Sequence, residues 1–246
     1  MNCRSKVTLI AASLWLAASA QALEAKLHKD DLPVLAPEVQ HETASKRVTS
    51  RFTRSHYKHF SLNDDFSKAI FERYVELLDY NRNIFTQADI DSFKDWSIEL
   101  DDQLKAGNNQ IAFDVYNLSM QKRFERFAYA LTLLDEEIKF DTDDEIELDR
   151  SEAAWPKDEE ELNELWRKRV KYDALNLKLT GKEWPEIKEA LEKRYNNAMK
   201  RITQTNNEDA FQLYMNAFAR QVDPHTSYLS PRNAEQFQSE MNLSLE

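Results

Sequence analysis

The sequence predicts an all-α protein, built as an irregular multi-helix domain, and three observations lead to this prediction. Only 2 of the 246 residues are glycine, whereas about 7% is usual, so tight β-hairpin turns that need glycine at positive φ are disfavoured. Charged residues make up 31% and aromatic residues 11% of the chain, a mixture rich in helix formers. Apolar side chains recur every three or four positions, which is the period of an amphipathic helix.

The first 22 residues have the form of a secretory signal peptide. Arg4 and Lys6 precede an uncharged apolar run over residues 7–18, and a small-residue cleavage pattern follows. We expect cleavage to leave Leu23 as the N-terminus of a periplasmic protein. The alternative is an uncleaved anchor, but a helix of about 12 residues is too short to span a bilayer. No later run approaches that length, so we expect no membrane span.

Turn-forming residues divide the rest of the chain into helical segments. The expected helices span residues 38–60, 66–78, 87–105, 113–138, 156–180, 185–202 and 207–222. Thr86 and Asn206 are expected N-caps, because each has an aspartate three positions later. Pro156 and Pro185 suit the first turn of the helices that they begin. No Pro- or Ser-rich linker interrupts residues 23–240, so we expect one helical domain there.

Two segments of the chain echo each other. In each, an aspartate ends a helix, an apolar residue and a capping hydroxyl follow six and seven positions later, and a phenylalanine follows fourteen positions later. The first runs from Asp79 to Phe93 and the second from Asp223 to Phe237. Convergent capping chemistry is the simpler explanation, and an old duplication is the alternative.

The last six residues have a different period. Met241, Leu243 and Leu245 alternate with polar residues, which is typical of a half-buried strand. A lone strand leaves its backbone groups without partners, so we expect residues 241–246 to begin a further domain and the chain to be part of a longer protein.

Several blocks of sequence resemble the tail-specific proteases, which are periplasmic carboxy-terminal processing serine peptidases. The blocks are RVTSRFTRSHY at 47–57, FERYVELLD at 71–79 followed by FT at 85–86, NLKLTG at 176–181, DPHTSYLSP at 223–231 and MNLSLE at 241–246. They occur in the family's order and cover nearly all of residues 23–246. The resemblance implies that residues 23–240 are the family's N-terminal helical domain and that residues 241–246 lead into a PDZ domain.

The resemblance also implies a serine endopeptidase whose serine nucleophile and lysine base follow the PDZ domain. No position here matches that dyad, so we expect no catalytic residue and no peptidase activity from this chain alone. The implied role is a non-catalytic scaffold. Its implied partners are unfolded or C-terminally tagged protein substrates, an adaptor lipoprotein and the PDZ and protease domains. The alternative is a free-standing periplasmic binding or chaperone-like module.

A basic face is the first candidate for docking or interdomain contact. Arg47, Arg51, Arg54 and Lys58 are spaced 4, 3 and 4 apart, so they share one side of a helix. Pairing with acidic residues of the same chain is the alternative explanation.

The segment after the helix that ends at Val222 is the second candidate. Asp223 and the proline after it favour a rigid turn, which would place His225 and Tyr228 between two domains.

Metal ions, cofactors and nucleic acid are not expected partners. His56 and His59 lack a third ligand nearby, and the acidic stretch over residues 141–152 lacks the glycine that a calcium loop needs, so we expect a solvated loop there. Phosphate-binding loops and dinucleotide-binding turns need clustered glycines, which are absent from this sequence. The formal net charge of −11 would repel the phosphates of a nucleic acid.

Overall fold

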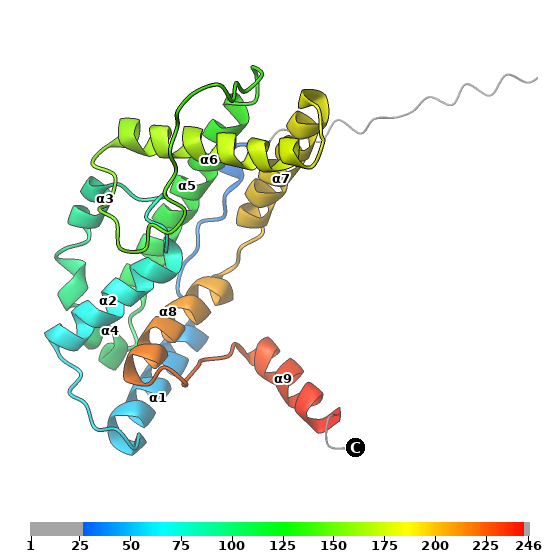
Figure 1. Ribbon diagram of the computed structural model, residues 1–246. Coiled ribbons are helices and arrows are strands. Elements are labelled where there is room, and N and C mark those ends of the chain that lie inside the picture. The colour runs from blue at the N-terminus through cyan, green and yellow to red at the C-terminus, as the bar shows by residue number, and fades with distance from the viewer. Residues whose placement is uncertain (1–26, 244–246) are drawn as a thin grey trace, which may run out of the picture.

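The computed structural model describes residues 27–243, and all of the regular structure in that range is helical (Figure 1). The α-helices are α1 Val39–Ser55, α2 Asp64–Leu78, α3 Gln87–Ser92, α4 Leu100–Ala106, α5 Gln110–Thr132, α6 Glu159–Leu179, α7 Trp184–Thr203, α8 Asn207–Val222 and α9 Pro231–Leu243. Two short 3-10 helices, η1 Lys29–Asp31 and η2 Trp96–Ile98, accompany them. The all-α prediction is therefore confirmed for the described residues, while the expected signal peptide lies outside them.

The expected caps are present at α3 and α8. The Thr86 side chain accepts a hydrogen bond from the Asp89 amide, and the Asn206 side chain accepts from the amides of Glu208 and Asp209. These contacts satisfy amides that have no partner inside the helix. Pro185 lies in the first turn of α7, as expected.

Several expected helix boundaries are wrong. The helix expected over residues 38–60 ends at Ser55, so Lys58 lies beyond the helix that carries the three arginines of the basic face. The helix expected over residues 87–105 is divided into α3, η2 and α4, and Ser67 occupies the break. Its hydroxyl donates to the Ser97 carbonyl and accepts from the Leu100 amide, so a side chain of α2 supplies the bonds that a continuous helix would have made. Helix α5 ends at Thr132 instead of residue 138, and α6 begins after the Asp158 cap, which leaves the earlier proline outside it.

The expected terminal strand is also wrong where it can be compared with the structure. Met241 belongs to α9, which continues to Leu243, while residues 244–246 lie outside the described range. Ala234, Phe237 and Met241 are spaced 3 and 4 apart, which is the spacing of apolar residues on one side of a helix. Met241 therefore also fits a helical pattern that begins earlier in the chain. A period of two over a few residues does not distinguish a strand from the end of a helix.

Two hydrophobic cores hold the domain together, and α5 runs through both. The larger core joins α2, α4, α8 and the first half of α5, with Phe113, Phe211 and Phe218 fully buried. The smaller core joins α6, α7 and the end of α5, with Trp166 and Tyr195 buried.

Phe127 of α5 is packed against both cores and is only partly buried. Its ring contacts Trp166 at 5.4 Å and Tyr195 at 6.0 Å between centroids. The apolar side of α5 therefore faces a different set of helices at each end.

Helix α9 extends away from the rest of the helices (Figure 1). Its Phe237 is 55% exposed and Leu229 just before it is 41% exposed. In the echoing segment, Phe85 and Phe93 are 0% and 2% exposed. The two segments therefore share their helix ends and caps but differ in burial, because the first packs into the larger core.

Candidate functional site

The basic face lies on the solvent side of α1. Arg47, Arg51 and Arg54 are exposed, whereas Ser45 and Thr49 on the opposite side of the helix are buried. Within residues 27–243, no ion pair joins these arginines to an acidic side chain. The alternative of pairing within the chain is thus not found there, and three guanidinium groups are left to solvent or to a partner.

Contacts with α4 and α8 fix the orientation of α1. The His41 ring stacks on Phe211 at 4.5 Å between centroids and forms a polar contact of 3.1 Å with Glu208. Gly107, at φ +75, ends α4 against α1. A Cβ at this glycine would lie 2.8 Å from the Glu42 backbone oxygen, so the helices approach closely only because no side chain is present.

Asp223 connects the end of α8 to the segment that follows α1. Its Oδ2 accepts a hydrogen bond from the Tyr57 hydroxyl at 2.5 Å, and its Oδ1 accepts from the His225 amide at 2.8 Å. The bond from Tyr57 lowers the pKa of Asp223 and raises that of Tyr57. The structure thus brings the two candidate regions together, three residues beyond Arg54. Tyr57 is the member of this site that the spacing of charged residues did not reveal.

Tyr228 is partly buried and stabilises the turn that follows Asp223. Its ring packs edge-on against Phe211 at 5.4 Å, and its backbone N–H and C=O bond the Asn216 side chain at 2.9 and 3.0 Å. Burial, followed by the nearby charge of Glu208, raises the pKa of Tyr228 to about 12. His225, in contrast, is exposed, so it is available to a partner.

We expect Tyr57→Phe to reduce stability at neutral pH and to lose that effect in acid. The folded-state pKa of Asp223 is depressed, so its contribution is present above the unfolded pKa of about 4 and disappears as the pH falls through the folded value. Thermal melts of both proteins between about pH 2 and 7 test this. A difference that persists unchanged at the acid end would show that the bond to Asp223 is not its source.

The described residues do not form a recognisable catalytic group. Ser67 is buried and both of its hydrogen bonds serve the backbone, so it cannot act as a nucleophile toward a substrate. Between residues 27 and 243, no cluster of three or more His, Cys, Asp or Glu side chains is arranged to hold a metal ion. No helix in this range is both long enough and apolar enough to cross a bilayer.

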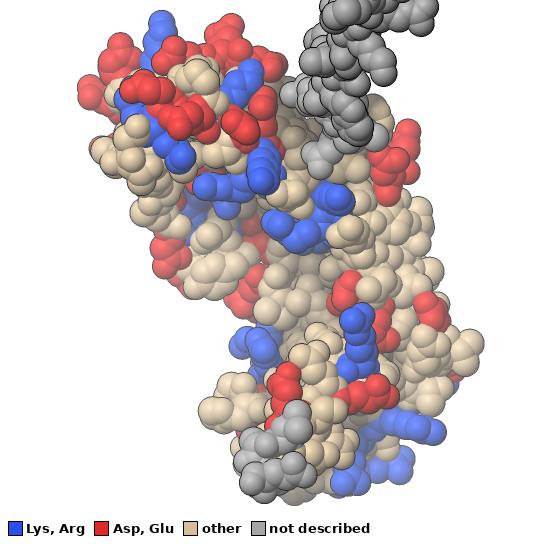
Figure 2. Space-filling view, turned by 90° about the vertical axis from the view of Figure 1, so that its right-hand side faces the viewer, with Lys and Arg blue, Asp and Glu red and all other residues tan. Residues whose placement is uncertain are grey.

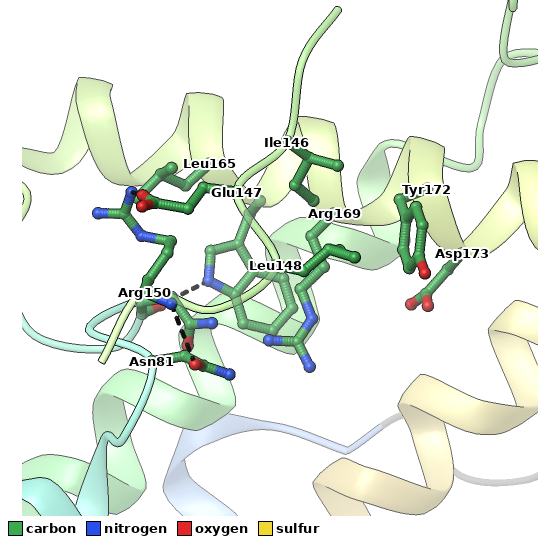
Figure 3. Close-up of a pocket in the computed structure, with 11 residues that line it drawn as sticks. Asn81, Ile146, Glu147, Leu148, Arg150, Leu165, Arg169, Tyr172 and Asp173 are labelled. Carbon is green, nitrogen blue, oxygen red and sulfur yellow. Dashed lines mark hydrogen bonds and ion pairs between the residues drawn. The ribbon is translucent and has the colours of Figure 1, made fainter. Parts of the chain in front are cut away.

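A cavity of about 190 Å³ lies between α6 and the segment that connects α5 to α6 (Figure 3). We call that segment, residues 133–158, the strap. Figure 3 shows Ile146 and Leu148 of the strap over Arg169, with Asn81 toward one end and Tyr172 toward the other. Sequence patterns did not indicate this cavity, because its walls come from three separate parts of the chain.

Comparison with known proteins identifies the family. The model of the family described as the tail specific protease N-terminal domain matches residues 48–232. This chain belongs to that family. The resemblance found in the sequence blocks is thus confirmed. A model of the B melanoma antigen family also matches residues 1–36, a stretch mostly outside the described residues that is too short to assign a family.

A tail-specific protease of Haemophilus influenzae is 48% identical to the chain over 240 residues. The alignment covers 97% of this chain but 34% of that protease, so the chain spans about a third of the relative's length. The match to the tail-specific protease N-terminal domain includes Arg51 and Arg54 of the basic face, the Asp223 corner and the cavity, whereas most of α9 lies beyond it.

Proposed function

We propose that this chain serves as the non-catalytic N-terminal helical scaffold and interaction domain of a periplasmic C-terminal processing serine endopeptidase. It would act together with the PDZ and protease domains of the full-length enzyme. The observation that carries the proposal is α9, which extends from a domain of this family with its Phe237 exposed and with Leu229, just before it, also exposed. An amphipathic helix gains stability mainly by burying its apolar face against another element, and the remaining two thirds of such a protease would supply that element.

A binding experiment in trans tests this role. The remaining two thirds of the Haemophilus influenzae protease, produced without its own helical region, would be titrated with the purified chain. We expect binding that Phe237→Ser weakens by about tenfold or more. Leu179→Ser is the matched control, because Leu179 is also apolar and exposed but lies at the end of α6. Equal weakening by both substitutions, or by neither, would contradict the assignment of α9.

The chain alone is expected to leave an unfolded substrate intact. A nucleophile, a base within reach and oxyanion donors are all needed for peptide hydrolysis, and we assign none of them here. Cleavage that copurifies with the chain and is lost on replacing one of its serines would overturn this expectation. Suppression of client aggregation without cleavage, and without binding to the protease fragment, would favour the chaperone-like alternative.

The basic face is proposed as a docking surface for an acidic partner, such as an adaptor or a substrate. Replacing Arg47, Arg51 and Arg54 together with glutamine should leave stability nearly unchanged, because exposed side chains without ion pairs contribute little. It should also weaken partner binding and reduce the salt dependence of that binding. A large fall in melting temperature would instead indicate a structural role.

Export to the periplasm is the last element of the proposal. It is supported by the order of charged, apolar and small residues before Leu23. Intact-mass measurement of the secreted protein should give a chain that starts at Leu23. A mass that includes Met1 in a membrane fraction would favour the uncleaved anchor.

A further inference from the structure

Ion pairs fasten the strap to α6 close in sequence to the residues that line the cavity. Asp144 lies 2.6 Å from Arg167 and 2.7 Å from Lys171, measured between carboxylate oxygens and side-chain nitrogens. The hydrogen bond from Arg167 is the largest cause, and together with the one from Lys171 it holds the pKa of Asp144 well below its usual range. The acidic stretch is therefore not simply solvated, because one of its carboxylates anchors the strap.

The acidic groups around the cavity already have partners. Glu147 pairs with Arg150 at 3.0 Å, and Asp173 pairs with Arg194 at 3.2 Å and accepts from the Tyr195 hydroxyl at 2.9 Å.

Asp79, which lies behind the wall, is buried and accepts backbone amides at 2.8 to 3.0 Å. Its carboxylate is also attracted by the charge of Arg169 at longer range. The carboxylates nearby are thus neutralised or hydrogen-bonded without using the donors of the Arg169 guanidinium.

Arg169 is the cation that remains, and it is exposed to solvent. Its guanidinium carbon lies 5.1 Å from the centre of the Trp166 ring, and within residues 27–243 it makes no ion pair or hydrogen bond. Stacking on an indole orients a guanidinium while leaving its N–H groups available. The Tyr172 hydroxyl and the side-chain amide nitrogen of Asn81 also lack a hydrogen bond within the described part of the chain. Three side chains that line the cavity therefore have hydrogen-bond donors available.

Apolar groups form the other side of the cavity. Ile146 and Leu148 come from the strap, and Leu165 comes from α6. At about 190 Å³ the space is smaller than the ~300–1,000 Å³ of sites that enclose a whole drug-sized ligand. The room suits a charged end group with a short branched chain.

We propose that this cavity binds a carboxylate that carries a small apolar group, with the guanidinium of Arg169 as its principal partner. Arginine recognises a carboxylate through parallel N–H donors, while Ile146 and Leu148 cover the apolar group. Such a carboxylate occurs in a free branched acid and at the end of a polypeptide. A site of this kind would give the helical domain a ligand of its own, separate from α9 and the basic face.

Isovalerate and its uncharged analogue isovaleramide are suitable probes for the intact chain. The indole N–H of Trp166 donates to the Asn83 carbonyl at 2.7 Å beside the cavity, so its NMR signal reports on occupancy. We expect a saturable shift with isovalerate, with a dissociation constant on the order of 1 mM, and a much smaller response to isovaleramide. A blocked peptide ending in leucine, as the free acid and as the amide, distinguishes the two sources. Tighter binding of the peptide acid would assign a polypeptide end, and weaker binding a free acid.

Two pairs of variants make the test specific. Arg169→Gln should weaken isovalerate binding by about tenfold or more, whereas Arg201→Gln makes the same change of charge on an exposed arginine of α7 and should not. Leu148→Asp places a carboxylate at the cavity wall and should abolish binding, whereas Leu148→Asn should retain it. Leu148 is exposed, so this pair remains informative if Arg169→Gln unfolds. Absence of a saturable shift, an equal response to the amide, or unchanged binding by Leu148→Asp would overturn the proposal.

Discussion

Phe218→Ala should lower the free energy of unfolding by about 3–5 kcal/mol, the usual cost of removing a fully buried phenylalanine ring. Phe218 is 0% exposed and contacts the rings of Phe52 and Phe66 with centroids 5.3 and 6.4 Å apart. These rings come from two further segments of the chain, so the space left by the deletion cannot close without moving all three. Urea denaturation of both proteins measures the change.

Phe237→Ala is the control for that measurement. It removes the same ring from α9, where the side chain is largely exposed, so the expected change is within about 0.5 kcal/mol. Similar losses at the two positions would mean that α9 is packed in solution against another part of the chain. A loss below about 1 kcal/mol for Phe218→Ala would mean that the larger core readily closes the space.

Asp79→Ala is expected to have the second largest effect, a loss of about 3 kcal/mol or more, because each buried donor left without a partner costs about 1–3 kcal/mol. The carboxylate accepts from the amides of Asn83, Ile84 and Phe85. Burial raises its pKa above the ordinary value, and these bonds only partly offset the rise. Burying this carboxylate is therefore unfavourable by itself, and its hydrogen bonds to the backbone hold the turn after α2.

The equivalent substitution in the echoing segment gives the comparison. Asp223 accepts one backbone amide, that of His225, so Asp223→Ala should be clearly milder in the same denaturation experiment. Asp79→Asn keeps an acceptor and should fall between wild type and Asp79→Ala. If Asp79→Ala were as mild as Asp223→Ala, the amides would have found water, and the turn would be more open than its burial indicates.

Local signals in the sequence were sufficient for much of the fold. The caps at Thr86 and Asn206 and the proline at the start of α7 depend on neighbouring residues, so the sequence contains all the information needed to place them. The period of α5 likewise predicts one apolar stripe. It does not predict that Phe127 is only partly buried, because that depends on where the two cores meet.

The sites depend on contacts between distant residues. Tyr57 and Asp223 are 166 positions apart, and nothing in the local pattern of either segment indicates their hydrogen bond. The spacing of the arginines predicts the basic face. That they make no ion pairs could not be predicted, because it depends on where the acidic residues lie in the folded protein. The cavity could not be predicted, because Asn81, Arg169 and the strap residues that line it come from three distant parts of the chain.

The surface also varies along the molecule. Figure 2 shows acidic and basic side chains intermingled at its upper end, while the middle of that face is mostly uncharged. The strap and α6 contain one such mixture of charges, because Arg167 and Lys171 share Asp144.

The passage of α5 through both cores has a consequence for how the domain opens. If α6 and α7 were to detach, the rings of Trp166 and Tyr195 would leave Phe127, and the end of α5 would be exposed while its first half stayed packed. Cooperative units of a protein are revealed by amide hydrogen exchange, and the slowest amides belong to the last structure to open. The amides of α5 around Phe113 and Met120 are therefore expected to exchange only through global unfolding, and those beyond Phe127 through a smaller opening of the upper helices.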